Sequence, residues 1–322
     1  MLLGIEIGGA KLQLGIGRGD GSPLVALERL DVEPEEGAAG ILDQIETAAR
    51  PLLKAHSPEA VGVGFGGPVD MAKGRVIKSH HVRGWDGFQL AAWCQEKIGL
   101  PTVVANDADV AALAEAAFGA GKGANPVFYV TVGSGIGGGL VVDGAIFTGG
   151  ANARAEIGHL RPGLAAERPD ETVESIASGW GIAAAARRSL DGGSRTLEIQ
   201  NAQTHVDDLT ARCHGVPQTL TAKMVYQAAG EGNAIAQQVI QKAATTLGWA
   251  IAQTISLAAP QRVVVGGGVS LAGERLFFLP LRAAAGRYVF PPLADSYDIA
   301  PAQLGEEVVP HGAIALAAQA AL

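Results

Sequence analysis

The chain has 322 residues and a net charge of −8, from 24 Lys and Arg against 32 Asp and Glu. This length is enough for one large or two ordinary domains with well-buried cores. The acidic balance, without a basic stripe, argues against nucleic acid as a partner. No apolar run reaches the roughly 20 residues that span a bilayer, and the start of the chain lacks the basic segment of a signal peptide. We therefore expect a cytoplasmic protein with no nucleic-acid or membrane partner.

Residues 1–118 predict an α/β unit that opens with an antiparallel meander. Apolar runs bounded by glycine-rich turns predict strands at residues 2–7, 12–17, 24–30, 61–65 and 102–105. Apolar side chains at helical spacing predict helices at residues 35–56, 85–98 and 107–118. The strand at 61–65 ends in a turn rich in Gly and Pro, where the backbone must bend sharply.

The same pattern returns from residue 127 onward. Strands are predicted at 127–132, 140–142, 145–147 and 262–265, and helices at about 174–190, 221–258 and 311–322. Each half carries a glycine hairpin after its first strand, which indicates a duplicated α/β fold of two lobes with a cleft between them. We expect a smaller N-terminal lobe of residues 1–118 plus 308–322 and a larger C-terminal lobe of residues 119–307. The segment 191–220 has weak periodicity and is expected to be a surface excursion.

Three glycine turns stand directly after strands. They are Gly8-Gly9, Gly133-Ser134-Gly135 and Gly266-Gly267-Gly268. Glycine turns of this kind expose backbone N–H groups that can hold phosphate oxygens. A single such turn is usually no more than a turn. Three of them in two related halves predict a nucleotide held by both lobes.

Asn106 and Asp107 lie where a buried strand gives way to a helix. Either residue can cap the helix, because a side-chain oxygen there satisfies backbone N–H groups that lack helical partners. The alternative is that Asp107 acts as a general base, accepting the proton of a hydroxyl as its oxygen attacks a phosphoryl group. Both interpretations hold together if one residue caps the helix and the other projects from it.

Glu156 and His159 are three residues apart, so they can face the same way on a helical turn. Glu174 follows shortly after them. Two carboxylates and an imidazole suit a polyhydroxylated ligand, since each hydroxyl needs both a donor and an acceptor. Solvated surface charges are the plainer interpretation of these residues. A metal site is a further alternative, although the spacing is not diagnostic of one.

Six segments carry a combined signature along nearly the whole chain. They are GIEIGGAK at 4–11, GVGFGGPVD at 62–70, residues 106–123, residues 131–160, ESIASG at 174–179 and RVVVGGGVS at 262–270. Together and in this order they resemble the ROK family of repressors and sugar kinases, within the actin-like ATPase superfamily. The resemblance implies a two-lobed actin-like ATPase (ribonuclease H-like) fold, with ATP and a sugar meeting in the cleft.

The resemblance also implies an ATP-dependent carbohydrate kinase that transfers the γ-phosphate to a sugar hydroxyl. Asp107 would be the general base, and Mg2+ would shield the transferring phosphate. The implied sugar-binding residues are Gly67, His81, Asn106, Asp107, Glu156, His159 and Glu174. The implied ATP-binding residues are Gly8, Gly9, Ala10, Lys11, Gly133, Ser134, Gly135, Gly266, Gly267 and Gly268. The family further implies a homodimer with a small-molecule sugar as substrate.

The sequence departs from the family pattern in four places. Glu6 stands where the family has an Asp near the metal, and we expect Glu6 to hold Mg2+ through a water. Ala10 replaces a hairpin Thr, and His81 replaces an Asn near the sugar. The family's cysteine-rich zinc loop is replaced by residues 161–172, and the chain has only 2 cysteines. No structural zinc is therefore expected, and this loop should be held by packing alone.

Two other functions stay open beside the kinase. One is a sugar or metabolite sensor on a kinase scaffold that has lost phosphoryl transfer, favoured by Glu6, Ala10 and the missing zinc loop. The other is a DNA-binding repressor, disfavoured by the net charge of −8 and by the absence of an N-terminal helix-turn-helix.

Overall fold

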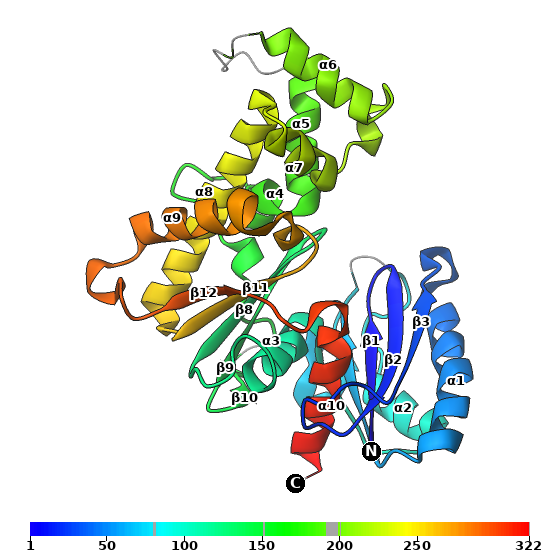
Figure 1. Ribbon diagram of the computed structural model, residues 1–322. Coiled ribbons are helices and arrows are strands. Elements are labelled where there is room, and N and C mark those ends of the chain that lie inside the picture. Colours follow the sequence, from blue (N-terminus) through cyan, green and yellow to red (C-terminus); the bar gives the residue numbers. More distant parts are fainter. Residues whose placement is uncertain (80–81, 151, 191–198, 200, 322) are drawn as a thin grey trace. The chain divides into compact units, whose positions relative to one another are not determined.

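A computed structural model describes residues 1–79, 82–150, 152–190, 199 and 201–321 (Figure 1). These residues form two compact units. The first comprises residues 1–129, 138–155 and 302–322, and the second comprises residues 130–137 and 156–301. The second unit is therefore smaller than the C-terminal lobe expected at 119–307. The expected domain boundaries stay a prediction.

The sheet of the first unit has five strands in the order β3-β2-β1-β4-β7. Its strands are β1 (Leu2–Ile7), β2 (Lys11–Gly17), β3 (Ala26–Asp31), β4 (Ala60–Phe65) and β7 (Thr102–Asn106). The meander β1-β2-β3 is antiparallel, with Glu6 opposite Gln13. β4 runs parallel to β1 and β7 runs parallel to β4, so these three strands end at the same edge of the sheet. A small antiparallel pair follows, β5 (Val69–Asp70) with β6 (Arg75–Val76).

Helices pack on the sheet of the first unit. They are α1 (Gly37–His56), α2 (Leu90–Ile98), α3 (Asp107–Ala117) and α10 (Val308–Ala320). Because side chains alternate along a strand, Leu3 and Ile5 of β1 join a core with α1 and α2, whereas Leu2 packs with Ile314 of α10. Gly62 of β4 also faces α10. A Cβ on Gly62 would lie 1.8 Å from the carbonyl oxygen of Ala313, so this close approach requires glycine.

The helix predicted over residues 85–98 begins only at Leu90. Trp85 is 1% exposed, and its ring meets Phe65 and Phe88 edge to face with centroids 5.1 and 5.3 Å apart. The apolar residues before Leu90 thus fill the core from an irregular turn. Periodicity alone could not separate this packing from a first helical turn.

A second five-stranded sheet repeats the order of the first, as β10-β9-β8-β11-β12. Its strands are β8 (Val127–Val132), β9 (Ile136–Val142), β10 (Ala145–Ile146), β11 (Arg262–Gly266) and β12 (Asp298–Pro301). β10 pairs antiparallel with β9, and β12 pairs parallel with β11. In each half the first strand lies centrally, beside its hairpin partner and a later strand. The predicted duplication is confirmed by this shared order.

The second unit is rich in helices. They are α4 (Val173–Ala177), α5 (Gly179–Leu190), α6 (Ala202–Arg212), α7 (Ala222–Gly230), α8 (Ala234–Ala258) and α9 (Leu279–Tyr288). The single helices predicted over 174–190 and 221–258 are each two helices. The segment 191–220 contains α6, and its residues 191–198 and 200 lie outside the described residues. In the part of the chain that the structure describes, no helix is both long enough and apolar enough to cross a bilayer.

Candidate active site

The β1–β2 hairpin of the first unit is closed by a hydrogen bond from Gly8 N to the carbonyl of Lys11, 2.9 Å long. Glu6 precedes this turn and its side chain is almost completely buried. Its Oε1 lies 3.2 Å from the ammonium of Lys11, and its Oε2 accepts a hydrogen bond from Gln13. Burial raises the pKa of the Glu6 carboxyl above its ordinary value, and the Lys11 charge offsets only part of this effect.

The surroundings of Glu6 bear on its expected contact with Mg2+. Both carboxylate oxygens already have partners from the same hairpin, Lys11 and Gln13. A hard cation needs carboxylate oxygens that can turn toward it. The donor set therefore does not fit a direct Glu6 ligand, and a contact through water stays a prediction. Ala10, at the tip of the hairpin, is exposed.

Asn106 and Asp107 lie at the start of α3, immediately after β7. Asn106 caps the helix, since its side-chain oxygen accepts from Ala108 N at 2.9 Å. The amide of Asn106 donates to the carbonyl of Gly67 at 3.0 Å and so anchors the turn after β4. The prediction that one residue caps is confirmed, and Asn106 is that residue.

Asp107 meets the glycine hairpin within the first unit. A Cβ placed on Gly66 would lie 3.5 Å from Asp107 Oδ2 and 3.5 Å from the Cα of Gly8. Asp107 Oδ1 accepts from Ala108 N at 2.8 Å, which orients the carboxylate at the helix start. Parallel strands ending at one edge bring these segments together, although 99 residues separate Gly8 from Asp107 in the sequence. Asp107 is half-buried, and its carboxylate lies beside the turn at Gly66 and the glycine hairpin.

Arg154 is a residue of this region that the sequence did not single out. Its guanidinium donates to Asp109 Oδ2 at 2.8 Å, and the two side chains are only 10% and 6% exposed. It also contacts the sulfur of Met71 at 2.7 Å. Arg154 therefore ties the segment before Glu156 to the first turn of α3. A lone Arg among alanines gave no sequence signal, because only the fold brings Asp109 to it.

The second glycine turn lies between β8 and β9 in the second unit. Gly133 N donates to the carbonyl of Gly135 at 2.9 Å. Its carbonyls accept from the start of α5: Gly179 N donates to Gly133 O at 2.8 Å, and Trp180 N donates to Ser134 O at 3.3 Å. The turn is therefore held in one conformation by the helix that follows α4.

A cavity of about 910 Å³ opens beside this turn, and the described residues that line it belong to the second unit. The turn and the start of α5 contribute Gly133, Ser134, Gly179 and Trp180. Apolar or aromatic side chains from other elements include Leu220, Tyr226, Leu271 and Leu276. This volume and mixed lining suit a nucleoside with its phosphates at the glycine turn. The charged groups in the lining are Arg187 and Lys223.

The three glycines of the third turn, after β11, have different surroundings. Gly268 lines the cavity. Gly267 has a φ of 88° and packs on β8, where a Cβ would lie 2.6 Å from the backbone of Val132. Gly266 is the buried end of β11. Of the predicted adenosine-side glycines, Gly268 therefore lines the cavity and Gly267 allows the backbone to pack on β8.

Glu156 precedes a short 3-10 turn (Ile157–His159) and His159 is its last residue, and both side chains are exposed. His159 N donates to the carbonyl of Glu156 at 3.0 Å. Glu174, on α4, accepts from Ile136 N at 2.7 Å and so lies against the glycine turn. His81 lies outside the described residues. Within the described ranges, no group of three or more His, Cys, Asp or Glu could hold a metal ion.

The loop at residues 161–172 is not held by packing alone, so that prediction was wrong. Arg161 donates to the carbonyl of Glu167 at 3.1 Å, and Arg168 forms an ion pair with Glu171 at 3.2 Å. Val173 N donates to the carbonyl of Leu160 at 2.8 Å and closes the loop at its base. Local polar contacts therefore shape this loop.

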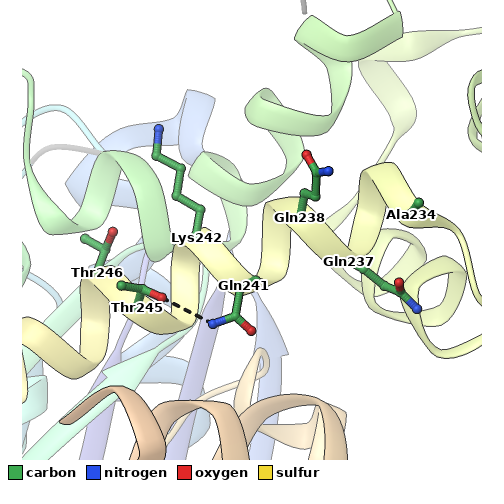
Figure 2. Close-up of a pocket in the computed structure, with 7 residues that line it drawn as sticks. All are labelled: Ala234, Gln237, Gln238, Gln241, Lys242, Thr245 and Thr246. Atoms are coloured by element: carbon green, nitrogen blue, oxygen red, sulfur yellow. Dashed lines mark hydrogen bonds between the residues drawn. The ribbon is translucent and has the colours of Figure 1, made fainter. Parts of the chain in front are cut away.

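A second hollow follows one side of α8 (Figure 2). It has a volume of about 620 Å³ and is lined by Ala234, Gln237, Gln238, Gln241, Lys242, Thr245 and Thr246. Figure 2 shows these side chains fanning out from a single helix, with Gln241 bonded to Thr245 at 3.3 Å. These side chains do not converge on one point, whereas the polar groups of a small-molecule site do. The cavity beside the second glycine turn is therefore the better candidate for a ligand site.

The repeated five-stranded sheets and their glycine turns define a two-lobed α/β protein of the actin-like ATPase fold. The chain belongs to the ROK family, whose family model matches residues 2–320. Both the expected fold class and the expected family are thereby confirmed.

Proteins similar to this chain include named sugar kinases. The chain is 33% identical over 315 residues to a glucokinase from Halalkalibacterium halodurans, covering 95% of this chain and 91% of that protein. It is 31% identical over 276 residues to an N-acetylmannosamine kinase from Shigella flexneri, covering 84% of each. A solved ROK family glucokinase from Streptomyces griseus, in complex with glucose and AMPPNP, superposes with a TM-score of 0.81. That structure is 29% identical and 99% of each chain is covered.

Proposed function

We propose that this protein is an ATP-dependent sugar kinase with Asp107 as its general base. The observation that carries the proposal is the position of Asp107, at the start of α3 with its carboxylate beside the turn at Gly66 and the hairpin at Gly8. The names of its relatives, glucokinase and N-acetylmannosamine kinase, support a sugar as the acceptor.

The proposed step is an in-line transfer. Asp107 accepts the proton of a sugar hydroxyl as the hydroxyl oxygen bonds to the γ-phosphorus of ATP. The bond from that phosphorus to the β–γ bridging oxygen breaks, and the products are a sugar phosphate and ADP. A carboxylate suits this role because it is ionised at neutral pH and needs only to lie within hydrogen-bond reach of the hydroxyl.

ATP fits the cavity of the second unit, and the similar structure that holds AMPPNP supports this assignment. The nucleoside would lie among Leu220, Tyr226 and Leu276, and the phosphates would meet the turn at Gly133–Gly135. ATP supplies the γ-phosphoryl group. Mg2+ would neutralise phosphate charge, and Glu6 does not fit as its direct ligand.

The sugar would be bound by side chains that the family pattern assigns. They are Gly67, His81, Asn106, Asp107, Glu156, His159 and Glu174. Relatives named for glucose and for N-acetylmannosamine make these two sugars the first acceptors to test. We also propose that the protein is a cytoplasmic homodimer and has no structural zinc.

A sugar sensor without phosphoryl transfer is the second candidate. It is favoured by the engagement of Glu6 with Lys11 and Gln13, which leaves the first hairpin without a carboxylate turned to a metal. Such a protein would bind sugar and nucleotide but would not release ADP faster in the presence of sugar.

A coupled ADP-release screen over hexoses, amino sugars and polyols tests the proposal, with Asp107→Asn as the variant. We expect at least one sugar to stimulate ADP release, and Asp107→Asn to lower kcat by about 10²–10⁴-fold, because the amide cannot accept the proton. Asp43→Asn, at an exposed position of α1, is the matched control and should match the wild type.

The same screen separates the two candidates. Sugar binding in calorimetry without sugar-stimulated ADP release would favour the sensor. Full activity of Asp107→Asn would instead overturn the role of Asp107 within an active kinase.

A further inference from the structure

The carboxylate of Glu174 joins helix α4 to the glycine turn at residues 133–135. Its Oε2 accepts the backbone N–H of Ile136, the first residue after the turn, at 2.7 Å. It also covers Gly135, since a Cβ there would lie 2.6 Å from Oε2. Only glycine at 135 lets this carboxylate reach the backbone of β9.

Glu174 is itself held in a fixed direction. Helix α4 begins with a reciprocal cap, in which Ser175 N donates to Thr172 Oγ1 at 3.2 Å and Thr172 N donates to Ser175 Oγ at 3.0 Å. The helix is anchored by Val173 and Ala177, which are buried. The side chain of Glu174 therefore leaves a backbone with little freedom to move away from the turn.

The hydrogen bonds of the turn decide where its N–H groups point. The carbonyls of Gly133 and Ser134 are directed at the start of α5 by the N–H groups of Gly179 and Trp180. In a trans peptide the C=O and the following N–H point in opposite directions. The N–H groups of Ser134 and Gly135 are therefore directed away from α5. This direction leaves them available as donors to a phosphate.

We propose that Glu174 is a positioning residue for the nucleotide. By accepting the Ile136 N–H it holds the turn at 133–135 in the conformation that presents two N–H donors to the phosphates. The inference rests on the proposed function, because that function places ATP phosphates at this turn. It differs from the sugar contact expected of Glu174, since it concerns nucleotide binding with no sugar present.

Substitutions of Glu174 can separate its contact with Ile136 from its expected contact with a sugar. Within the described residues, Oε1 of Glu174 has no hydrogen-bond partner, so a sugar contact and the Ile136 contact use different oxygens. Glu174→Asp keeps the charge but withdraws the carboxylate by roughly 1.5 Å, one carbon–carbon bond. Glu174→Gln keeps the reach and an acceptor oxygen but removes the charge.

The experiment measures the affinity of ATP, ADP and adenosine for the full chain by calorimetry, without sugar. We expect Glu174→Asp to weaken ATP and ADP about tenfold, the loss of one charge-assisted hydrogen bond that orders the turn. Glu174→Gln should stay within about threefold of the wild type, because its amide oxygen can still accept the Ile136 N–H. Adenosine, which has no phosphate, should bind equally to all three proteins.

Glu171→Gln, three residues earlier and engaged only with the local loop at Arg168, is the matched control and should change no affinity. The inference is overturned if Glu174→Asp binds ATP as the wild type does, if Gln is the more damaging substitution, or if adenosine weakens in parallel with ATP. Failure of the wild type to bind ATP at all would instead overturn the proposed function, so the two failures are distinguishable.

Discussion

Near the candidate base Asp107, an ion pair joins Arg154 to Asp109, and both side chains are nearly buried. Arg154 and Asp109 are 10% and 6% exposed in their side chains, and their atoms lie 2.8 Å apart. Asp109 belongs to the same first helical turn as Asp107. Taking two charges from water is costly, and the mutual attraction compensates only while both partners are present. The pair therefore makes the position of α3 depend on Arg154.

Replacing Arg154 should show this dependence. Arg154→Met keeps an unbranched side chain but leaves Asp109 without its cation, and we expect a loss of about 3–5 kcal/mol in the free energy of unfolding. Urea denaturation followed by circular dichroism measures it. Arg50→Met is the control, because Arg50 is 71% exposed and pairs with Glu46 on the helix surface. That change should cost under about 1 kcal/mol; an equal effect for both variants would show that burial of the pair is irrelevant.

At the scale of elements, the β1–β2 hairpin carries a polar network on the face of the sheet opposite its main core. Gln13 connects three parts of it, donating to Glu6 and to the carbonyl of Glu306 and accepting from Arg29. Buried Gln13 is thus satisfied by Glu6, by Arg29 of β3 and by the segment before α10, and buried Glu6 is satisfied by Gln13 and Lys11 of β2. Gln13 is therefore the centre of this network, and the Glu6 carboxylate is one of its partners.

Burial should make the stability contribution of Glu6 depend on pH. Because its pKa is raised in the folded state, folding favours the protonated form. This contribution is greatest below the ordinary pKa of 4.5 and is lost as the pH rises through the folded pKa. Glu6→Gln removes the charge, so we expect it to stabilise the protein more near neutral pH than near pH 4.5, in urea titrations at both values.

Glu28→Gln, at an exposed position of the neighbouring strand β3, is the control for the Glu6 experiment and should show no such difference. If Glu6→Gln stabilises the protein, relative to the wild type, less near neutral pH than near pH 4.5, the Lys11 ion pair outweighs desolvation.

Several element boundaries could not be predicted from the sequence, because helix caps and the packing of small residues set them. Helices α7 and α8 share one apolar pattern, but Asn233 caps the second helix through Ala236 N and so separates them. Ser178 plays a similar part between α4 and α5, where Gly181 packs against Ser175 O with no room for a side chain. The sequence pattern did not predict helix α9 or strand β12. Helix α9 meets α8 through small residues. A Cβ on Gly248 of α8 would lie 2.5 Å from Ala284 of α9. Small-residue packing leaves no strong hydrophobic period.

At the scale of the whole molecule, the candidate base and the candidate nucleotide cavity belong to different units. Asp107 and the first hairpin belong to one unit, whereas the cavity and the second glycine turn belong to the other. Nucleotide binding should therefore need no residue near Asp107, although phosphoryl transfer requires it.

Thermal unfolding with ADP tests this division. At an ADP concentration of about 100 times Kd, binding to the folded state adds ~2.7 kcal/mol, which should raise Tm by about 4 °C for a chain of this size. Asp107→Asn should show the same rise, measured by differential scanning fluorimetry, although it lacks turnover. Loss of the ADP effect in Asp107→Asn would contradict the division and would place the nucleotide phosphates against α3.

The sequence by itself indicated the family, the duplicated fold and a set of candidate residues, because glycine turns, buried strands and the Asn-Asp helix start are local features with local physical causes. Only the tertiary structure decided what these residues touch. It showed that Glu6 is engaged by Lys11 and Gln13, that Glu174 bonds to the backbone of Ile136, and that Arg154 meets Asp109. Contacts between distant segments depend on strand order and helix packing, which no single stretch of sequence contains.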